Sequence, residues 1–247
     1  MVGESFKEKI ETVSRKNKSK LILALDISEE NAKNGKVEEK CLSILDETSD
    51  YIAGVKIGYS LVLKTGIEII DKISNSTSIP IISDFKIADI PPISQQIATR
   101  AYESGANAVI SHGFTGEDSL EAIIQKAKEE GDKGVFVVSN MSHPGGKKFI
   151  QPVKNQILEM VKEAEATGII GPATRPEQVQ SLRSKAGEDL LILTPGIGAQ
   201  GGKPGDAIRH GADYEIVGRA IYTSDSPKES AAKIRDKINE NAEDRSY

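Results

Sequence analysis

The feature that most constrains the fold of this chain is a short apolar segment that recurs about every 30 residues. In each segment the apolar run leads into a glycine or a polar residue, which is typical of a buried strand where it leaves the core. The eight segments are LILALD (21–26), IAGVKIG (52–58), IPIISDFK (79–86), AVISHG (108–113), GVFVVSN (134–140), GIIGPA (168–173), LLILTPG (190–196) and YEIVGR (214–219). Helical patterns opened by Asp, Ser, Asn or Pro lie between them, as in 119–130, 155–166 and 227–238.

Eight alternating strand and helix units favour one architecture. Near-continuous apolar strands indicate a parallel sheet that is covered by helices, and eight such units close the (β/α)8 barrel, or TIM barrel. A doubly wound open sheet is the alternative. It is disfavoured because no GxGxxG follows the first strand and because the polar or glycine residues that follow the apolar runs are spread over all eight strands instead of gathering at one switch point.

The chain shows no linker or change of composition, so we expect residues 1–247 to form a single barrel domain. Phe6, Ile10 and Val13 follow a helical spacing and predict an N-terminal helical extension within residues 1–20 that packs on the barrel. The polar segment 239–247 is expected to be a flexible tail.

Charge and cysteine content exclude several classes of partner. The 32 basic and 37 acidic residues give a net charge of −5, and no basic patch accompanies a nucleic-acid recognition motif, so we expect no nucleic-acid partner. Cys41 is the single cysteine, which rules out an intramolecular disulfide and a multi-cysteine metal site. We expect a buried thiol in a reducing compartment.

The apolar segments are too short for membrane insertion. None approaches the roughly 18 residues of a membrane-spanning helix, and the N-terminus lacks the apolar stretch of a signal peptide. We therefore expect a cytoplasmic protein with no membrane partner.

Charged residues follow the first three predicted strands. In a barrel of this type, active sites form at the carboxyl ends of the strands. Asp26 ends the first segment, Lys56 lies near the end of the second, and the third carries Asp84 and Lys86. Because residues i and i+2 of a strand share a face, Asp84 and Lys86 should point the same way. The pattern predicts an active site with two lysines and at least two carboxylates; a buried lattice of ion pairs is the structural alternative.

The last two predicted strands are followed by features of a phosphate site. TPGIGAQGGKPG (194–205) holds five glycines in ten positions, so its backbone N–H groups are free to face an anion, although a glycine-rich loop by itself is often only mobile. The eighth segment ends in Gly218 and Arg219, and barrels frequently bind phosphate with the loops after strands seven and eight. Arg219 is suited to a bidentate phosphate contact, or to a salt bridge on the rim.

The fifth predicted strand leads into SNMSHPGG (139–146), where the Ser142 hydroxyl can bind a ligand or cap the loop. His112 and His143 also follow strands, but neither has a second histidine or carboxylate at metal-ligand spacing. We interpret both histidines as structural and expect no metal site.

Taken together, these motifs resemble one family, the orotidine 5′-phosphate decarboxylases in their short archaeal form. The resemblance extends over about residues 21–223. It rests on LILALD, VKIGYSLVL, DFKIADIP, MSHPG, GPATRPE, PGIGAQGG and VGRAIY, which occur in the order and spacing of the family.

The resemblance implies decarboxylation of orotidine 5′-phosphate to UMP in pyrimidine biosynthesis, with no cofactor. It implies that Lys86 donates the proton to C6 of the pyrimidine. Lys56, Asp84, Lys86 and Asp89 are similar to an alternating charged tetrad in which the second aspartate enters from the other subunit of a homodimer.

The remaining implied roles concern substrate binding. Asp26 is similar to the residue that binds the ribose hydroxyls together with Lys56, and Ser142 to the serine that reads the pyrimidine edge. Gln200 is similar to the glutamine that reaches the phosphate from a mobile loop. The other positions implied to bind substrate are Pro195, Gly196, Gly201, Gly218 and Arg219.

One position departs from the family. The family often has a threonine four residues after the second aspartate, where it helps to hold the ribose, and here that position is Ile93 with Ser94 beside it. Either the backbone or Ser94 replaces the threonine contact, or the contact is missing.

Two rival functions keep the same fold. A Mg²⁺-dependent sugar-phosphate decarboxylase or epimerase with a DxKxxD motif would need an added acidic ligand near the strand ends. A non-catalytic nucleotide-binding barrel should lack a member of the tetrad, and all four are present.

Overall fold

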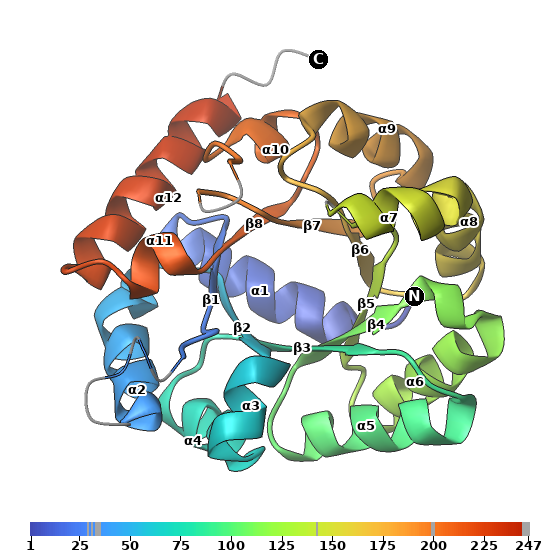
Figure 1. The fold of residues 1–247 in the computed structure, drawn as a ribbon, viewed down its shortest axis with the longest axis horizontal. Coiled ribbons are helices and arrows are strands. Elements are labelled where there is room, and N and C mark those ends of the chain that lie inside the picture. The colour runs from blue at the N-terminus through green and yellow to red at the C-terminus, as the bar shows by residue number, and fades with distance from the viewer. Residues whose placement is uncertain (29, 31, 33–35, 142, 199–200, 244–247) are drawn as a thin grey trace.

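A computed structural model shows a closed barrel of eight parallel strands in sequential order, which confirms the predicted TIM barrel (Figure 1). It describes residues 1–28, 30, 32, 36–141, 143–198 and 201–243. The strands are β1 (Leu21–Ala24), β2 (Gly54–Gly58), β3 (Ile81–Ile87), β4 (Ala108–His112), β5 (Gly134–Val138), β6 (Gly168–Ile170), β7 (Leu191–Pro195) and β8 (Tyr214–Val217). Pairing of β1 with β8 closes the barrel.

Helices surround the barrel on its outside (Figure 1). The α-helices are α1 (Glu4–Asn17), α2 (Val37–Thr48), α3 (Tyr59–Thr65), α4 (Glu68–Ser76), α5 (Pro91–Glu103), α6 (Glu117–Glu129), α7 (Pro144–Phe149), α8 (Lys154–Glu163), α9 (Pro176–Ala186), α10 (Asp206–Arg209), α11 (Arg219–Tyr222) and α12 (Pro227–Glu243). Short 3-10 turns are η3 (Ser49–Tyr51), η4 (Gly113–Thr115) and η5 (Gln151–Val153). The predicted helices 119–130, 155–166 and 227–238 thus correspond to α6, α8 and α12.

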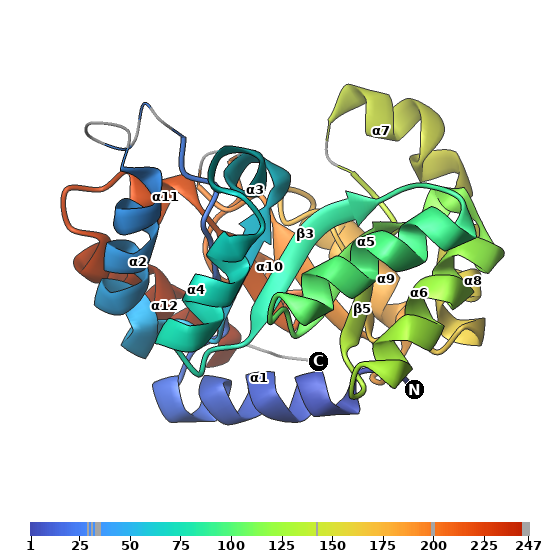
Figure 2. The ribbon, with the colours of Figure 1, turned by 90° about the horizontal axis from the view of Figure 1, so that it is seen from below.

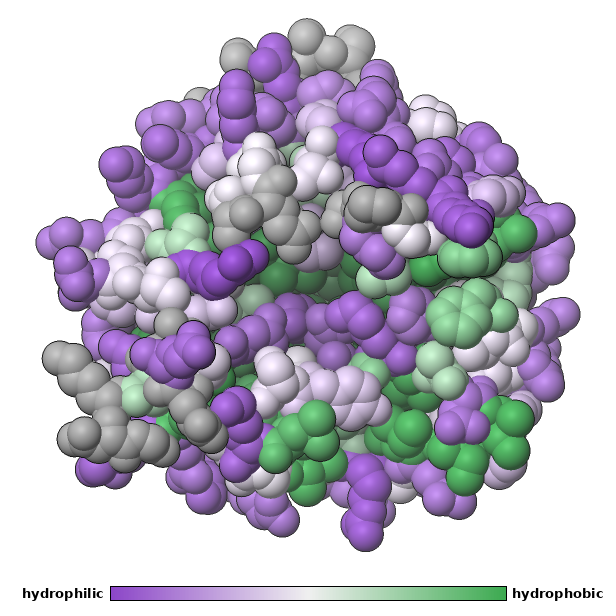
Figure 3. Space-filling model, in the orientation of Figure 1, coloured by the Kyte–Doolittle hydropathy of each residue, from purple (hydrophilic) through white to green (hydrophobic). Residues whose placement is uncertain are grey.

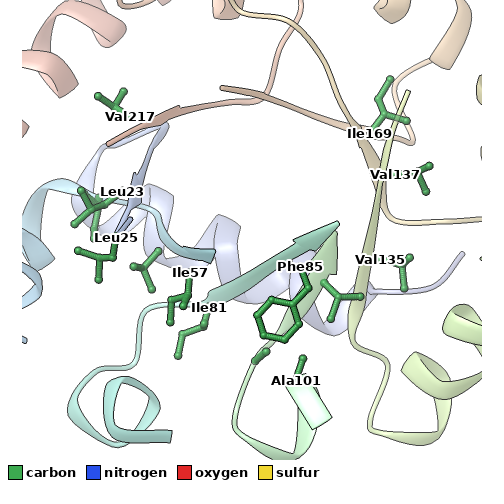
Figure 4. Packing of buried hydrophobic residues seen from close by; sticks show 14 of the residues in the cluster. Leu23, Leu25, Ile57, Ile81, Phe85, Ala101, Val135, Val137, Ile169 and Val217 are labelled. Carbon is green, nitrogen blue, oxygen red and sulfur yellow. The ribbon is translucent and has the colours of Figure 1, made fainter. Parts of the chain in front are cut away.

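Strand alternation divides the core into two layers. Ile22, Ile82 and Phe136 belong to the cluster that fills the barrel interior, whereas their neighbours Leu23 and Ile81 belong to the larger cluster between strands and helices. Figure 4 shows side chains of this outer layer, among them Phe85 of β3 beside Ala101 of α5. The alternation follows because successive side chains of a strand point to opposite faces. Even-numbered residues of β3 therefore face the interior.

Helix α1 covers the amino-terminal end of the barrel (Figure 2). Phe6 and Ile10 are buried in the interior cluster, and the Phe6 ring meets the Phe136 ring edge to face at a centroid distance of 5.4 Å. Val13 is also buried, so the three apolar residues of α1 with helical spacing all face the body of the protein. Helix α1 therefore closes the amino-terminal end of the barrel, opposite the carboxyl ends of the strands.

Two further expectations can be compared with the structure. α12 continues to Glu243, so the segment predicted as a flexible tail from residue 239 is helical as far as 243. Cys41 is a buried free thiol, and burial raises its pKa to about 12. Of the helices within the described ranges, none is both long and apolar enough to cross a membrane.

Candidate active site

A cavity of about 370 Å³ opens at the carboxyl ends of the strands. Figure 3 shows this face hollowed near its centre, with hydrophilic and hydrophobic residues meeting at the hollow. Eight predicted site residues line the cavity, namely Asp26, Lys56, Asp84, Lys86, Pro195, Gly196, Gly218 and Arg219. Residues far apart in the sequence thus meet at the face where barrels carry their active sites.

Four of these side chains form an alternating chain of charges. Lys56 Nζ lies 3.1 Å from Asp26 Oδ2 and 3.0 Å from Asp84 Oδ2. Lys86 Nζ lies 2.7 Å from Asp84 Oδ1. The Lys56 side chain is 7% exposed and that of Lys86 41%, so the buried lysine ties the strands together while Lys86 presents its ammonium to the cavity.

The ion pairs keep the two buried members of this chain charged. Burial by itself would lower the pKa of Lys56, but Asp84 and Asp26 outweigh burial and hold this pKa above its ordinary value. Burial would likewise raise the pKa of Asp84, yet Lys56 and Lys86 hold it below its ordinary value. Both groups are therefore ionised near neutral pH, and Asp84 places a fixed negative charge in the cavity wall.

The backbone at Lys86 is unusual. Its φ is 44°, in the left-handed region that residues with a side chain seldom occupy. The pairing of β3 with β4 also shifts here: Ser83 pairs with Val109 and Ile87 with Ser111, so four residue steps on β3 face two on β4. Irregular backbone of this kind re-aims side chains and clusters at functional sites. The irregularity orients Lys86 at the edge of the cavity.

The loops after β7 and β8 form another side of the cavity. Pro195 and Gly196 line it from the first loop, and Gly218 and Arg219 from the second. A backbone bridge between Ile197 and Gly202 joins the two legs of the β7 loop. Gly201 has a φ of 91° and lies in this loop outside the cavity lining. Two predicted binding residues, Ser142 and Gln200, lie outside the described residues.

Among the described residues, Asp89 makes no ion pair with the four members of the charge chain. Its side chain is exposed and accepts a hydrogen bond from the Ile90 N–H at 2.8 Å, at the start of α5. Its carbonyl oxygen lies 2.9 Å from Ser94 Oγ and 2.8 Å from Ser119 Oγ. Ser94 is fully buried, so its hydroxyl holds the backbone of Asp89 and does not face the cavity. This burial disfavours Ser94 as the replacement for the threonine contact.

The cavity also contains residues that the sequence analysis did not select. Asn140 lines it, and its Nδ2 donates to Gln178 Oε1 at 2.8 Å while its Oδ1 accepts from the Met141 N–H at 2.8 Å. An apolar wall is formed by Ile110, Val138, Ile170 and Ile216. The two-residue alternation of the strands would have identified these apolar residues, because each lies near the end of a strand and faces the barrel interior.

The histidines lie apart from the cavity lining. His112 packs its ring against Phe114 at a centroid distance of 4.7 Å, and burial together with the nearby Lys86 lowers its pKa. His143 is the N-cap residue of α7. Over the described parts of the chain, no three His, Cys, Asp or Glu side chains are grouped so as to hold a metal ion.

The chain matches a known family over most of its length. A model of the orotidine 5′-phosphate decarboxylase / HUMPS family matches residues 19–234. The chain is 47% identical over 222 residues to the orotidine 5′-phosphate decarboxylase of Methanococcoides burtonii, covering 90% of this chain and 98% of the relative. It is 44% identical over 220 residues to that of Thermococcus kodakarensis, covering 89% and 97%.

Solved structures agree with these relatives. A crystal structure of orotidine 5′-monophosphate decarboxylase from Methanocaldococcus jannaschii, complexed with the inhibitor BMP, superposes with a TM-score of 0.81 at 41% identity. The superposition covers 90% of this chain and 99% of that one. The Sulfolobus solfataricus enzyme superposes with a TM-score of 0.79 at 31% identity, again covering 90% and 99%.

Proposed function

The chain belongs to the orotidine 5′-phosphate decarboxylase / HUMPS family and is a carboxy-lyase, and from this premise we propose that it converts orotidine 5′-phosphate to UMP without a cofactor, with Lys86 as the proton donor. The observation that carries the proposal is the charge chain Asp26–Lys56–Asp84–Lys86, whose ammonium end faces the cavity. The reaction belongs to pyrimidine nucleotide biosynthesis.

Decarboxylation of this substrate requires a cation next to C6 of the pyrimidine. The bond between C6 of the pyrimidine and the carboxylate carbon breaks, CO2 leaves, and the electron pair stays on C6. No carbonyl of the ring is placed to absorb that pair, so the barrier must fall by an amount on the order of 20 kcal/mol, near the upper range of enzymes. A fixed ammonium beside C6 stabilises the developing charge. Lys86 then transfers one proton from Nζ to C6, which completes UMP and leaves a neutral amine.

Asp84 holds Lys86 and also acts on the substrate. Because its carboxylate stays ionised, it forms an ion pair with the Lys86 ammonium at 2.7 Å and holds that group in place. It also repels the substrate carboxylate, by about 4 kcal/mol for two charges about 4 Å apart at an effective dielectric constant near 20. That repulsion disappears when neutral CO2 forms, so it favours the transition state over bound substrate. The apolar wall with Ile110 and Val138 offers neutral CO2 a favourable environment.

The other lining residues bind the parts of the substrate that do not react. We assign the ribose hydroxyls to Asp26 and Lys56, which lie together at the β1 and β2 ends. We assign the phosphate to Gly196, Gly218 and Arg219, where backbone N–H groups and a guanidinium suit an anion. Pro195, Gly201 and Gln200 belong to the same phosphate loop, and Ser142 to pyrimidine recognition, by the family resemblance. Remote phosphate binding then supplies energy for the reaction centre.

We further propose a homodimer in which Asp89 enters the site of the partner subunit. Large apolar side chains are exposed in the segments that follow β2, β3 and β4: Leu63 on α3 is 82% exposed, Ile90 beside Asp89 62% and Phe114 on η4 57%. Exposed apolar residues of this size favour a protein interface. In a two-fold dimer the same patch would meet itself, bringing each Asp89 toward the opposite subunit and completing the tetrad around Lys86.

The test is turnover of orotidine 5′-phosphate, followed by absorbance, with purified protein in excess EDTA. We expect conversion to UMP that survives EDTA and is abolished in Lys86→Ala. Lys126→Ala serves as the control, because Lys126 pairs with Glu129 and Glu130 on the surface of α6. Activity that vanishes with EDTA would instead favour a metal-dependent sugar-phosphate enzyme, and UMP binding without turnover would favour a nucleotide-binding barrel.

A further inference from the structure

A buried carboxylate beneath the β7 loop has no part in the site described so far. Glu215 lies on β8 between the inward-facing Tyr214 and Ile216, so its side chain points away from the barrel interior, and it is fully buried. Its Oε2 accepts the Gly205 N–H at 2.8 Å, and its Oε1 accepts the Ala207 N–H at 3.1 Å. Both carboxylate oxygens therefore hold the backbone at one point, where the β7 loop ends and α10 begins.

This point anchors the return leg of the loop whose first leg lines the cavity. The Gly202 N–H donates to the Gly196 carbonyl at 3.1 Å, and the Gly198 N–H donates to the Gly202 carbonyl at 2.9 Å. Gly196 lines the cavity, so the position of the return leg is transmitted to the cavity wall through these hydrogen bonds. Asn241 of α12 fixes the same leg, because its Nδ2 donates to the Pro204 carbonyl at 2.8 Å.

We propose that Glu215 is a positioning residue for phosphate binding: its ionised carboxylate holds the return leg of the β7 loop so that the loop backbone is preorganised for the phosphate group. The inference rests on the phosphate assignment of the proposed function and extends it to a residue outside the cavity. Glu215 also lies on the strand that leads into Gly218 and Arg219, so one side chain links the two loops of the phosphate site.

The ionised carboxylate of Glu215 is the form that accepts both hydrogen bonds well. A protonated carboxyl group carries its own O–H and loses acceptor capacity at one oxygen, so it accepts the two N–H groups less well. Burial raises the pKa of Glu215 to about 7, against the opposing effect of the Gly205, Ile208 and Ala207 N–H groups. Among neighbouring groups, Asp206 on α10 raises this pKa further, whereas the strand partners Leu21 and Thr194 and the helix residue Asn241 are uncharged. The anchor therefore strengthens as the pH rises through neutrality.

The negative charge of Glu215 would by itself repel a phosphate. The side chain, however, points away from the barrel interior, and two N–H dipoles face it, which reduces its field on the cavity side. We therefore expect anchoring to outweigh repulsion. The two effects have opposite signs in a binding experiment, so the experiment distinguishes them.

The test compares the unaltered protein with Glu215→Gln by calorimetric binding of UMP and of uridine at about pH 6 and about pH 8. At the higher pH we expect the variant to bind UMP about tenfold more weakly, the size of one lost charge-assisted hydrogen bond. At the lower pH the two proteins should converge, because Glu215 is then largely protonated in the unaltered chain. The phosphate of UMP also titrates in this pH range, but it does so equally with both proteins, so its effect cancels in the ratio of their UMP affinities. Uridine, which lacks the phosphate, should bind both equally.

Asn241→Ala provides the matched control, since it loosens the same leg through a group that does not titrate; its effect on UMP binding should be the same at both pH values. A second readout needs no variant: the Gly205 and Ala207 amide resonances of the unaltered protein should shift with an inflection near pH 7. A UMP affinity ratio that does not change with pH, equal weakening of uridine binding, or tighter UMP binding by Glu215→Gln would each overturn the positioning role. Those results leave decarboxylation intact, whereas failure of the unaltered protein to bind UMP would overturn the proposed function and this role together.

Discussion

The ammonium of Lys86 lies 2.7 Å from the carboxylate of Asp84, two residues earlier on the same strand, and Lys86 adopts a left-handed backbone conformation to do so. An ordinary strand places residues i and i+2 on one face without requiring positive φ. The irregular pairing between Ser83 and Ile87 thus accompanies the placement of one particular ammonium. The proposed reaction assigns its proton transfer to that ammonium.

Lys86→Ala should reduce kcat by about 10⁴-fold or more, because it removes both the proton donor and the cation that stabilises the developing charge. Binding of UMP should change far less, since the phosphate and ribose contacts remain. Steady-state kinetics together with UMP calorimetry separate the two effects. A comparable loss in UMP affinity would argue that Lys86 serves binding and not the chemical step.

Arg219→Ala should weaken UMP binding by about 10- to 100-fold, the range expected for hydrogen bonds to a charged group. Uridine binding should stay the same, because Arg219 is assigned to the phosphate alone. Calorimetry of UMP and of uridine with Arg219→Ala compares the two ligands on the same variant. If uridine binding falls as much as UMP binding, Arg219 supports the cavity in some other way.

Lys56→Ala should lower the free energy of unfolding by about 3 kcal/mol, since it leaves the buried Asp84 with only the more exposed Lys86 as an ion-pair partner. Asp26→Asn is the matched control, because it removes a partner that is itself 37% exposed, and we expect a loss below about 1 kcal/mol. Urea unfolding at neutral pH measures both values. Equal losses in the two variants would contradict the central position of Lys56.

Glu215 should make the protein less stable as the pH rises from 4.5 to about 7. Below pH 4.5 its carboxyl group is protonated in both the folded and the unfolded chain. Between the two pKa values the unfolded chain releases the proton while the folded chain retains it, so rising pH favours unfolding. The total change is about 3 kcal/mol for a pKa difference of about 2.5.

Unfolding of the unaltered protein and of Glu215→Gln across this pH range measures the effect as a difference between the two. The unaltered protein should lose stability relative to the variant as the pH rises. A constant difference would show that the carboxyl group titrates at the same pH in both states.

Mixing two inactive variants tests the dimer. If Asp89 enters the partner's site, a mixed dimer of Lys86→Ala and Asp89→Ala has one site with both substitutions and one with neither. Equal amounts of the two variants, exchanged under mild denaturation, should then recover about one quarter of the activity of the unaltered protein. No recovery, with mixed dimers demonstrated by mass spectrometry, would place Asp89 in the site of its own subunit.

The sequence by itself determined the barrel, the ends of its strands and the face that Asp84 and Lys86 share. These follow from local regularities: an apolar segment repeated eight times, polar residues after each one, and the two-residue period of a strand. Motif resemblance then identified the family. Asp26, Lys56, Gly218 and Arg219 could be selected for the same reason, because each ends or follows a recognisable strand.

Only the tertiary structure decided which of these residues meet and how. The pairing of Lys56 with both Asp26 and Asp84 depends on the register of three strands, and no local pattern encodes that register. The positive φ of Lys86 lies where β3 pairs irregularly with β4, and the Asp89 carbonyl accepts a hydrogen bond from Ser119 Oγ of α6, so both also involve elements other than β3. Glu215 shows the limit most clearly: in YEIVGR it occupies a strand position that would suit an apolar residue, and only the folded path of the β7 loop and α10 brings the Gly205 and Ala207 N–H groups to its carboxylate. Such contacts depend on how strands, loops and helices pack against one another, and the apolar periodicity of the sequence does not report that packing.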